Sequence, residues 1–478
     1  MKTSIAKNGM LNAIKTISTV VFPLVTVPYV TRILGADGIG KVNFSNSIIG
    51  YFTLLASLGI ETYAIKECSK FKGNRQLIEE IASEIFSINC LMMLFSYALL
   101  WISLKLFVNL QTYQEIIIIL SANIFFGILN AEWINIAFED FNYITKRTIL
   151  FQIVSAGLMF LFIKTSDDYI TYSAIMMFAV AGPSLMNFVY RERFCKIRLI
   201  SSMNMQKHIK PILFLFALLL SQSILSNVDI TMLGIFIGDK AVGLYSMAFK
   251  IYITAEKIVS SVAYVLLPQL TLCFSQRDFI TANQLLNKTA DIMFAITFPL
   301  VIGMMILAED IMMLVCGQEF CSASSCLVIL SIVMFVNIFG GGLWGNLILL
   351  PSDREKYFML ACMISALINV VANYLVIPDY GIVGAACTTL FSTLIIFILC
   401  KYYAPKQIDI YLSKATIIPV VIGSGVIAVV CITGKYISPL PLFRILFSGI
   451  CGITLYFGIL YKSKHIVITH IVSKLLRY

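Results

Sequence analysis

The sequence predicts an all-α, polytopic membrane protein with about 14 transmembrane helices. Three observations predict this fold class. The chain of 478 residues is 59% hydrophobic and only 13% charged, and its mean hydropathy is +0.91. Apolar stretches recur along the whole chain, and a helix needs about 20 such residues to cross a bilayer. The stretches also lack the short alternating pattern of a membrane β-barrel.

The individual spans follow from these apolar stretches and the polar links between them. They are expected at 9–31, 43–65, 80–104, 115–137, 146–164, 169–190, 211–236, 243–268, 285–307, 325–350, 357–377, 382–402, 412–433 and 441–461. The first residues carry charge but no small-residue cleavage site, so we expect a lead into the first helix rather than a removed signal. The links are too short for a soluble domain, and the longest polar one is 191–210.

The distribution of Lys and Arg predicts the orientation in the membrane. Of 35 such residues, 25 fall in the links on the side of the N-terminus and seven in the links on the opposite side. Because cytoplasmic loops are enriched in Lys and Arg, both termini are expected in the cytoplasm. The net charge of +10 is therefore explained by orientation, and no nucleic-acid partner is expected.

A glycine motif indicates an internal repeat. The segment GADGIG at 35–40 matches GDKAVG at 238–243 in spacing, six expected helices further along, and a looser copy lies at 380–384. Two six-helix lobes related by an axis along the membrane normal would give this pattern. The expected parts are an N-terminal lobe at 1–195, a basic cytoplasmic linker at 196–210, a C-terminal lobe at 211–405, and helices 13 and 14 with a cytoplasmic tail at 406–478.

The same motif does not indicate a nucleotide site. It follows an apolar helix, whereas a phosphate-binding loop follows a strand and has a different glycine spacing. It is also expected on the outer side. We therefore expect Gly35 to Gly40 to form a tight external turn between two close helices.

Polar side chains form stripes at helical spacing inside several spans. Ionisable groups in a membrane are costly and usually face an interior cavity. The candidate site residues are Asn12 and Lys15 in the first helix, Asn46 and Glu61 in the second, Glu132 in the fourth, Asp229 in the seventh, and Lys250 and Lys257 in the eighth. Lys250 and Lys257 lie two turns apart on one face, which suits an anion such as a pyrophosphate.

Structural alternatives stay open for these residues. Lys15 is also suited to snorkel to the cytoplasmic interface. Glu61 lies close enough to a helix end to be partly solvated, and Asp229 and Lys250 could form a structural pair. The three histidines, His208, His465 and His470, lie in polar flanks, so neither histidine chemistry nor a metal site is expected. Most of the twelve cysteines read as apolar fillers, with a disulfide among Cys316, Cys321 and Cys326 as the alternative.

Several segments resemble a known family. They are PYVTRILGADGIGKVNFSNSIIGYF (28–52), LGIETYAIKE (58–67), AEWINIAFEDF (131–141), SNVDITMLGIFIGDKAVGLYSMAFKI (226–251) and VLLPQL (265–270). With the two-lobe organisation, they resemble the MATE-like multidrug/oligosaccharidyl-lipid/polysaccharide (MOP) exporter superfamily. Within it, the chain is similar to the Wzx-type flippases of O-antigen and capsule synthesis.

This resemblance implies a function. Undecaprenyl-diphosphate-linked oligosaccharide would be turned from the inner to the outer leaflet of a bacterial cytoplasmic membrane by alternating access. In the related lipid II flippases an arginine of helix 8 lines the cavity, and Lys250 occupies the matching position. Helices 13 and 14 form a groove for the lipid tail in those flippases. The implied partners are the lipid-linked glycan, membrane lipids, a polysaccharide polymerase and a chain-length regulator.

The energy source and the rival functions follow from the same features. No ATP-binding loop occurs in the sequence, so coupling to Na⁺ or H⁺ is expected, with Asp229 or Glu61 as carriers and no other cofactor. A MATE-like exporter of drugs or metabolites is the main alternative, but the lysines of helix 8 favour an anionic substrate. An enzyme is not expected, because the acidic pairs at 167–168 and 309–310 read as solvated helix caps.

Overall fold

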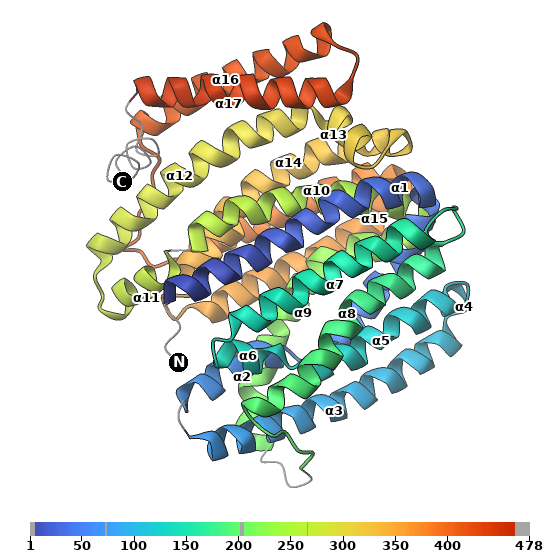
Figure 1. Ribbon diagram of the computed structural model, residues 1–478. Helices are drawn as coiled ribbons and strands as arrows, with labels where there is room; N and C mark the ends of the chain where they lie inside the picture. The colour runs from blue at the N-terminus through green and yellow to red at the C-terminus, as the bar shows by residue number, and fades with distance from the viewer. Residues whose placement is uncertain (1–4, 72–73, 201–204, 265, 464–478) are drawn as a thin grey trace. The chain divides into compact units, whose positions relative to one another are not determined.

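The computed structural model describes residues 5–71, 74–200, 205–264 and 266–463 (Figure 1). All regular structure in these ranges is helical, and they contain no strand. Eleven of the described helices are long and apolar enough to cross a membrane. The prediction of an all-α, multi-pass membrane protein is confirmed. The chain divides into an N-terminal unit, Met1–Gly243, and a C-terminal unit, Leu244–Tyr478.

The N-terminal unit contains nine α-helices, one 3₁₀ turn and the first residues of a tenth helix within the described part of the chain. They are α1 (Ile5–Ser57), α2 (Ile60–Lys70), α3 (Arg75–Leu106), α4 (Val108–Gln111), α5 (Gln114–Asn130), α6 (Glu132–Ala137), α7 (Phe141–Phe162), α8 (Tyr169–Tyr190), η1 (Arg191–Arg193), α9 (Met205–Phe236) and the start of α10 (Asp239–Tyr264). The long helix α1 packs against α3, α5, α7 and α9, and so connects four other helices of this unit.

The C-terminal unit continues along α10. Its further elements are α11 (Leu267–Ser275), α12 (Phe279–Ile306), α13 (Ala308–Val315), η2 (Gln318–Ala323), α14 (Ser324–Asn337), the π-helix η3 (Ile338–Leu349), α15 (Glu355–Tyr403), α16 (Lys414–Ile437) and α17 (Pro441–Lys462). Figure 1 shows α16 and α17 as a pair beside α12, and α16 packs against both.

Two of the eleven long helices each cover two expected spans. Helix α1 changes direction at Gly35, where φ is 67°, and α15 does so at Gly381, where φ is 53°. Helix α10 is not among the eleven, because its 26 residues include five charged side chains. The number of fourteen crossings therefore stays a prediction that depends on how the bent helices and α10 cross the membrane.

Two expected helices are interrupted, so their predicted bounds are wrong. The second expected helix stops at Ser57, because Leu58 and Gly59 both have positive φ angles, and α2 begins after them. The fourth stops at Asn130, because Ala131 has a φ of 39°. Positive φ is uncommon for Leu and Ala, so only Gly59 signals the first of these turns in the sequence, and no residue signals the turn at Ala131. Glu61 and Glu132 therefore lie in the first turns of short helices.

The two copies of the glycine motif lie against each other within the N-terminal unit. Gly35 and Gly238 both have positive φ. A Cβ atom on Gly40 would lie 1.8 Å from the carbonyl oxygen of Asp239, and one on Gly243 would lie 2.0 Å from that of Ala36. The two contacts are reciprocal, since each late glycine of one copy touches the residue after the first glycine of the other. The expected tight turn is therefore also a close backbone contact.

Polar side chains of α3 hold the link that follows α8. The backbone N–H groups of Lys196, Arg198 and Ile200 donate to Glu79 Oε1, Ser83 Oγ and Ser87 Oγ, at 3.0, 3.1 and 3.0 Å. The three accepting side chains are one helical turn apart on α3. The donors are every second residue of the extended segment 196–200. The first residues of the expected linker 196–210 are therefore bound along α3.

The C-terminal unit contains a ladder in the same register. The N–H groups of Asp409, Tyr411 and Ser413 donate to Asn283 Oδ1, Asn287 Oδ1 and Asp291 Oδ1 of α12, at 2.9, 2.8 and 3.1 Å. The amides of Asn283 and Asn287 in turn donate to the carbonyls of Gln407 and Asp409. In each unit, therefore, one helix carries polar residues at every fourth position, and these residues accept hydrogen bonds from the backbone N–H groups of an extended segment. We call the two extended segments, 196–200 and 409–413, the straps.

We expect the glycine contact to make a measurable contribution to stability. Gly243→Ala forces a methyl group onto the Ala36 carbonyl and should lower stability by about 1–3 kcal/mol, as overpacking does. Gly127→Ala is the matched control, because a Cβ there meets nothing within 4 Å. In a helix it should be neutral or stabilising by about 0.5–1 kcal/mol. Thermal unfolding of the full chain in detergent measures both, and equal midpoints would contradict the contact.

Candidate anion-binding site

The turn at Ala131 places a carboxylate inside the N-terminal unit. Helix α5 ends at Asn130, and α6 begins at once with Glu132. The Asn187 side-chain amide of α8 donates to the carbonyl oxygen of Asn130, which is left without an intrahelical partner by the turn. This bond joins α8 to the end of α5. The side chain of Glu132 thus starts from a fixed point at a helix terminus.

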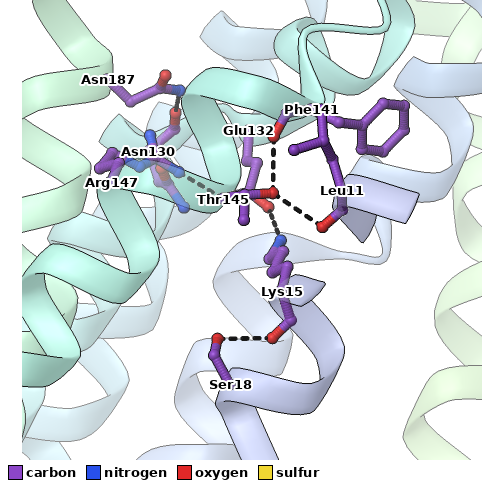
Figure 2. Close-up of polar contacts among 9 residues, drawn as sticks. All are labelled: Leu11, Lys15, Ser18, Asn130, Glu132, Phe141, Thr145, Arg147 and Asn187. Atoms are coloured by element: carbon purple, nitrogen blue, oxygen red, sulfur yellow. Dashed lines mark hydrogen bonds and ion pairs between the residues drawn. The ribbon is translucent and has the colours of Figure 1, made fainter. Parts of the chain in front are cut away.

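Glu132 binds two cations from two other helices. Lys15 of α1 pairs with its Oε1 atom, and Arg147 of α7 pairs with its Oε2 atom (Figure 2). The Arg147 side chain is only 1% exposed, that of Glu132 is 16% exposed and that of Lys15 is 25% exposed. Arg147 is therefore the buried end of the cluster, and Lys15 is its accessible end. We call these three residues the charge cluster.

Hydrogen bonds to the backbone hold α7 against α1 beside the cluster. The Thr145 hydroxyl lies 3.0 Å from the carbonyl oxygen of Leu11 and 2.7 Å from that of Phe141. Ser18 donates to the carbonyl of Lys15 at 2.8 Å (Figure 2). Because both partners of Glu132 lie within a few residues of these bonds, the spacing of the two cations is set by the packing of α1 on α7.

An aromatic stack supports the buried end. The Arg147 guanidinium lies 5.4 Å from the ring centre of Tyr143, which stacks on Tyr190 at 3.5 Å and 7°. The Tyr190 hydroxyl donates to Asp140 at 2.7 Å, and Asp140 caps α7 by accepting the N–H of Tyr143. Stacking of a cation on an aromatic face stabilises a guanidinium that has lost water. The position of Arg147 is therefore fixed from both sides.

The cluster retains unused hydrogen-bond donors. The Nε and Nη1 atoms of Arg147 are buried and have no hydrogen-bond partner among the described residues. Asn135 lies one turn further along α6. Its side-chain nitrogen and oxygen are also buried and also lack a hydrogen-bond partner among the described residues. Buried donors without partners are costly, and a bound anion or water usually satisfies them. With two cations to one carboxylate, the charge cluster itself carries one excess positive charge.

Glu61 lies at the margin of the cluster. It is exposed in the first turn of α2, which packs on α6, and it interacts electrostatically with both Glu132 and Lys15. An ionised Glu61 therefore offsets the excess charge of the cluster. Its neutralisation would leave that charge for a ligand.

The structure brings together only part of the predicted site. Lys15 and Glu132 form an ion pair, and Glu61 lies near them. Asn46 is exposed, and the side chain of Asn12 lies outside the described side chains. Asp229 is buried in α9, where it interacts electrostatically with Tyr51 of α1.

The two lysines of α10 belong to the C-terminal unit. Lys250 is half-buried, whereas Lys257 is exposed. Their spacing puts them on one helix face as expected, but they do not share one environment. Their role in binding an anion stays a prediction.

Two other expectations on individual residues are corrected. Arg147, at the start of the expected span 146–164, is also buried, inside α7. His208, expected in a polar flank, is 1% exposed. Asp310, expected as a solvated cap, is buried and pairs with Arg444 of α17 at 2.8 Å. Each of the three is buried against a partner on another helix: Glu132 for Arg147, Glu84 for His208 and Arg444 for Asp310. The twelve cysteines are free thiols, so the three near η2 form no disulfide.

Comparisons with known proteins bear on the family and the fold. A family described as "Polysaccharide biosynthesis protein" matches residues 5–274, which is more than half of the chain. A putative O-antigen transporter of Escherichia coli is 22% identical over 81% of this chain and 94% of its own length. A probable low-salt glycan biosynthesis flippase of Haloferax volcanii is 26% identical, over 39% of each chain.

One solved structure shows the fold over nearly the whole chain. The lipid II flippase MurJ, in an inward closed conformation, superposes with a TM-score of 0.77 and covers 94% of this chain and 97% of its own. The identity of 16% limits this likeness to the fold. The resemblance seen in the sequence is therefore confirmed for the family and for the fold.

The three members of the charge cluster should differ in their effect on stability. Glu132→Gln leaves a buried guanidinium without its anion and should cost about 3–5 kcal/mol. Arg147→Met leaves Glu132 paired with Lys15 and should cost less. Lys15→Met removes a partly exposed cation and should cost about 1 kcal/mol or less. Thermal unfolding in detergent ranks the stabilities of the three variants, with exposed Lys105→Met as the control. Equal losses of stability in all three variants would contradict the arrangement of the charge cluster.

Proposed function

Because the chain belongs to the polysaccharide biosynthesis protein family, we propose that it is a flippase for lipid-linked glycans. Its substrate would be undecaprenyl-diphosphate-linked oligosaccharide repeat units, turned from the inner to the outer leaflet of the bacterial cytoplasmic membrane. The observation that carries this proposal is the charge cluster, with its excess positive charge and its unused Arg147 donors. The glycan flippase and O-antigen transporter among its relatives support the substrate class.

The physical problem is to carry a diphosphate through about 30 Å of hydrocarbon. Cations and N–H groups fixed in the protein replace the water that the diphosphate loses. Lys15 would make the first contact, because it is the accessible end of the cluster. Arg147 would supply the stronger field from its buried position. The sugars would follow the head group through a polar path while the polyprenyl tail stays among apolar side chains.

An apolar pocket of about 300 Å³ in the C-terminal unit suits a segment of such a tail. It is lined by Phe335, Phe339, Trp344 and Phe397, and Lys401 is the charged residue in its wall. These residues come from α14, η3 and α15, whereas the family resemblance places the tail groove at α16 and α17. We propose this pocket as a second contact for the lipid.

The energy source is proposed to be an ion gradient. Glu61 is the candidate carrier in the N-terminal unit, because its protonation or the binding of Na⁺ would change the net charge of the cluster. Asp229 is the second candidate. Either group would couple ion binding to anion binding through charge alone.

The topology is proposed to comprise fourteen crossings in two similar halves, with both termini in the cytoplasm. The two side-chain ladders of α3 and α12, with their straps in one register, support an internal repeat. A polysaccharide polymerase and a chain-length regulator are proposed partners that would receive the exported unit.

The alternative function is export of drugs or metabolites by a MATE-like mechanism. Such a protein would need acidic groups for cationic compounds. The charge cluster instead has more cations than carboxylates, and this favours the flippase. If a deletion strain became sensitive to cationic dyes while its surface glycan stayed intact, the exporter would be favoured over the flippase.

The role of Lys15 is testable in cells. Lys15→Gln should reduce surface glycan about tenfold or more at normal protein level, because a charge contact of about 1.4 kcal/mol or more is lost. Lys15→Arg should restore most of it, and Lys105→Gln is the exposed control. Export equal to wild type in Lys15→Gln would count against the site.

The lysines of α10 give a separate test. Lys250→Ala should reduce export more than Lys257→Ala, because Lys250 is half-buried and Lys257 is exposed. Full export in both variants, at normal protein levels, would remove α10 from the proposed anion path.

A further inference from the structure

A polar pocket lies in the N-terminal unit between the start of α5, the start of α8 and the part of α1 that follows its bend at Gly35. Its volume is about 450 Å³, within the range of about 300–1,000 Å³ that is usual for small-molecule sites. None of its lining residues belongs to the charge cluster. The polar residues of its wall are Lys41, Gln111, Thr112, Gln114, Glu115 and Tyr169.

The side chains of this wall suit a neutral ligand that carries hydroxyl groups. Gln111 and Gln114 are exposed, and each amide offers N–H donors and a carbonyl acceptor. Thr112 adds a hydroxyl, which both donates and accepts. Lys41 and Glu115 are the charged residues of the wall, and their charges cancel. A diphosphate would therefore meet as much negative as positive charge here, whereas sugar hydroxyls can bond to all of these groups.

Two tyrosines of the pocket are held in place by neighbouring groups. The ring centre of Tyr169 lies 4.8 Å from Lys41 Nζ, and that of Tyr113 lies 4.9 Å from the ring centre of Phe44. The Tyr113 hydroxyl donates to Asp239 Oδ1 at 2.7 Å. The C–H face of a sugar can pack on such rings while its hydroxyls reach the amides. Because the rings are already fixed, a ligand would lose little affinity to ordering them.

The pocket adjoins the contact between the two copies of the glycine motif. Lys41 follows Gly40, the last glycine of the first copy, and Asp239 belongs to the second copy. The close backbone contact of Gly40 is with the carbonyl oxygen of Asp239, the residue that also accepts the Tyr113 hydroxyl. A ligand that contacts Lys41 and Tyr113 therefore bears on the place where α1 meets the start of α10.

We propose that this pocket binds a neutral sugar residue of the glycan. The proposal rests on the flippase function and deepens it, because it adds a sugar site to the proposed diphosphate site. The bend of α1 beside the pocket is the turn that the distribution of Lys and Arg predicts to be external. A sugar bound there would hold the glycan at the outer face while the diphosphate is released. The glycine contact would position one wall of the site.

Binding is measured by saturation-transfer NMR on the full-length protein in lipid nanodiscs. Glycoside detergents are avoided, because their sugar head groups would compete. The probe is the free oligosaccharide released by mild acid from the lipid-linked pool of the host strain. Wild type should transfer saturation to the sugar protons. Thr112→Trp fills the pocket from an exposed position and should reduce the transfer several-fold, as should Gln111→Ala combined with Gln114→Ala.

The controls separate the pocket from the charge cluster and from the fold. Lys105→Trp is the exposed control outside the pocket, and it should leave the transfer unchanged. Lys15→Gln should also keep the transfer, and inorganic pyrophosphate should not displace the oligosaccharide. Thermal unfolding of Thr112→Trp should match that of wild type, since the replaced side chain is exposed.

Three results would overturn the sugar site. They are no transfer from wild type, equal transfer from wild type and Thr112→Trp, and loss of the transfer on addition of pyrophosphate. The flippase function is tested apart from this, because the binding measurement needs no translocation. Normal glycan export by cells depleted of the chain would contradict the flippase function, and saturation transfer would still decide whether the pocket binds a sugar.

Discussion

Polar groups placed in hydrocarbon must find their partners within the chain, and this constraint governs the structure. Helices satisfy the backbone internally, which is why the described regular structure is helical. Where the chain leaves a helix, side chains take over. Glu79, Ser83 and Ser87 bind one strap, and Asn283, Asn287 and Asp291 bind the other. The same constraint pairs Lys15 and Arg147 with a single carboxylate.

The charge cluster leaves some of its hydrogen-bond donors without partners in the described part of the chain, and this is the basis of its proposed function. A purely structural ion network would use all the donors of a buried guanidinium, because unpaired donors cost stability. Arg147 instead keeps two nitrogens without partners among the described residues, next to a lysine that is 25% exposed. A transporter that must bind and release an anion needs a site that is positioned but incompletely satisfied. The geometry of the cluster is compatible with this proposal, and the Tyr143 and Tyr190 rings stack beside Arg147.

The features that depend on local periodicity could be predicted from the sequence. Lys15 and Glu132 could be selected because polar residues at helical spacing stand out in an apolar span. The break at Ala131 could not, because alanine is not a turn signal, and at Leu58 the single glycine that follows, Gly59, is a weak signal inside an apolar stretch. Arg147 was missed because a basic residue at a span boundary looks solvated. Its burial depends on Glu132 and Tyr143, and only the Tyr143-to-Arg147 spacing of one turn hinted at it. The burial of His208 was missed for the same reason, since its partners Tyr63 and Glu84 come from α2 and α3.

The leaflet distribution of the lipid-linked glycan in cells depleted of this chain tests the central claim most directly. A probe that reaches only the outer face, applied to intact cells and then to opened ones, gives the distribution. Depletion should make the lipid-linked repeat units accumulate on the cytoplasmic face, and re-expression of the chain should return them to the outer face. A normal level of repeat units on the outer face after depletion would contradict the account.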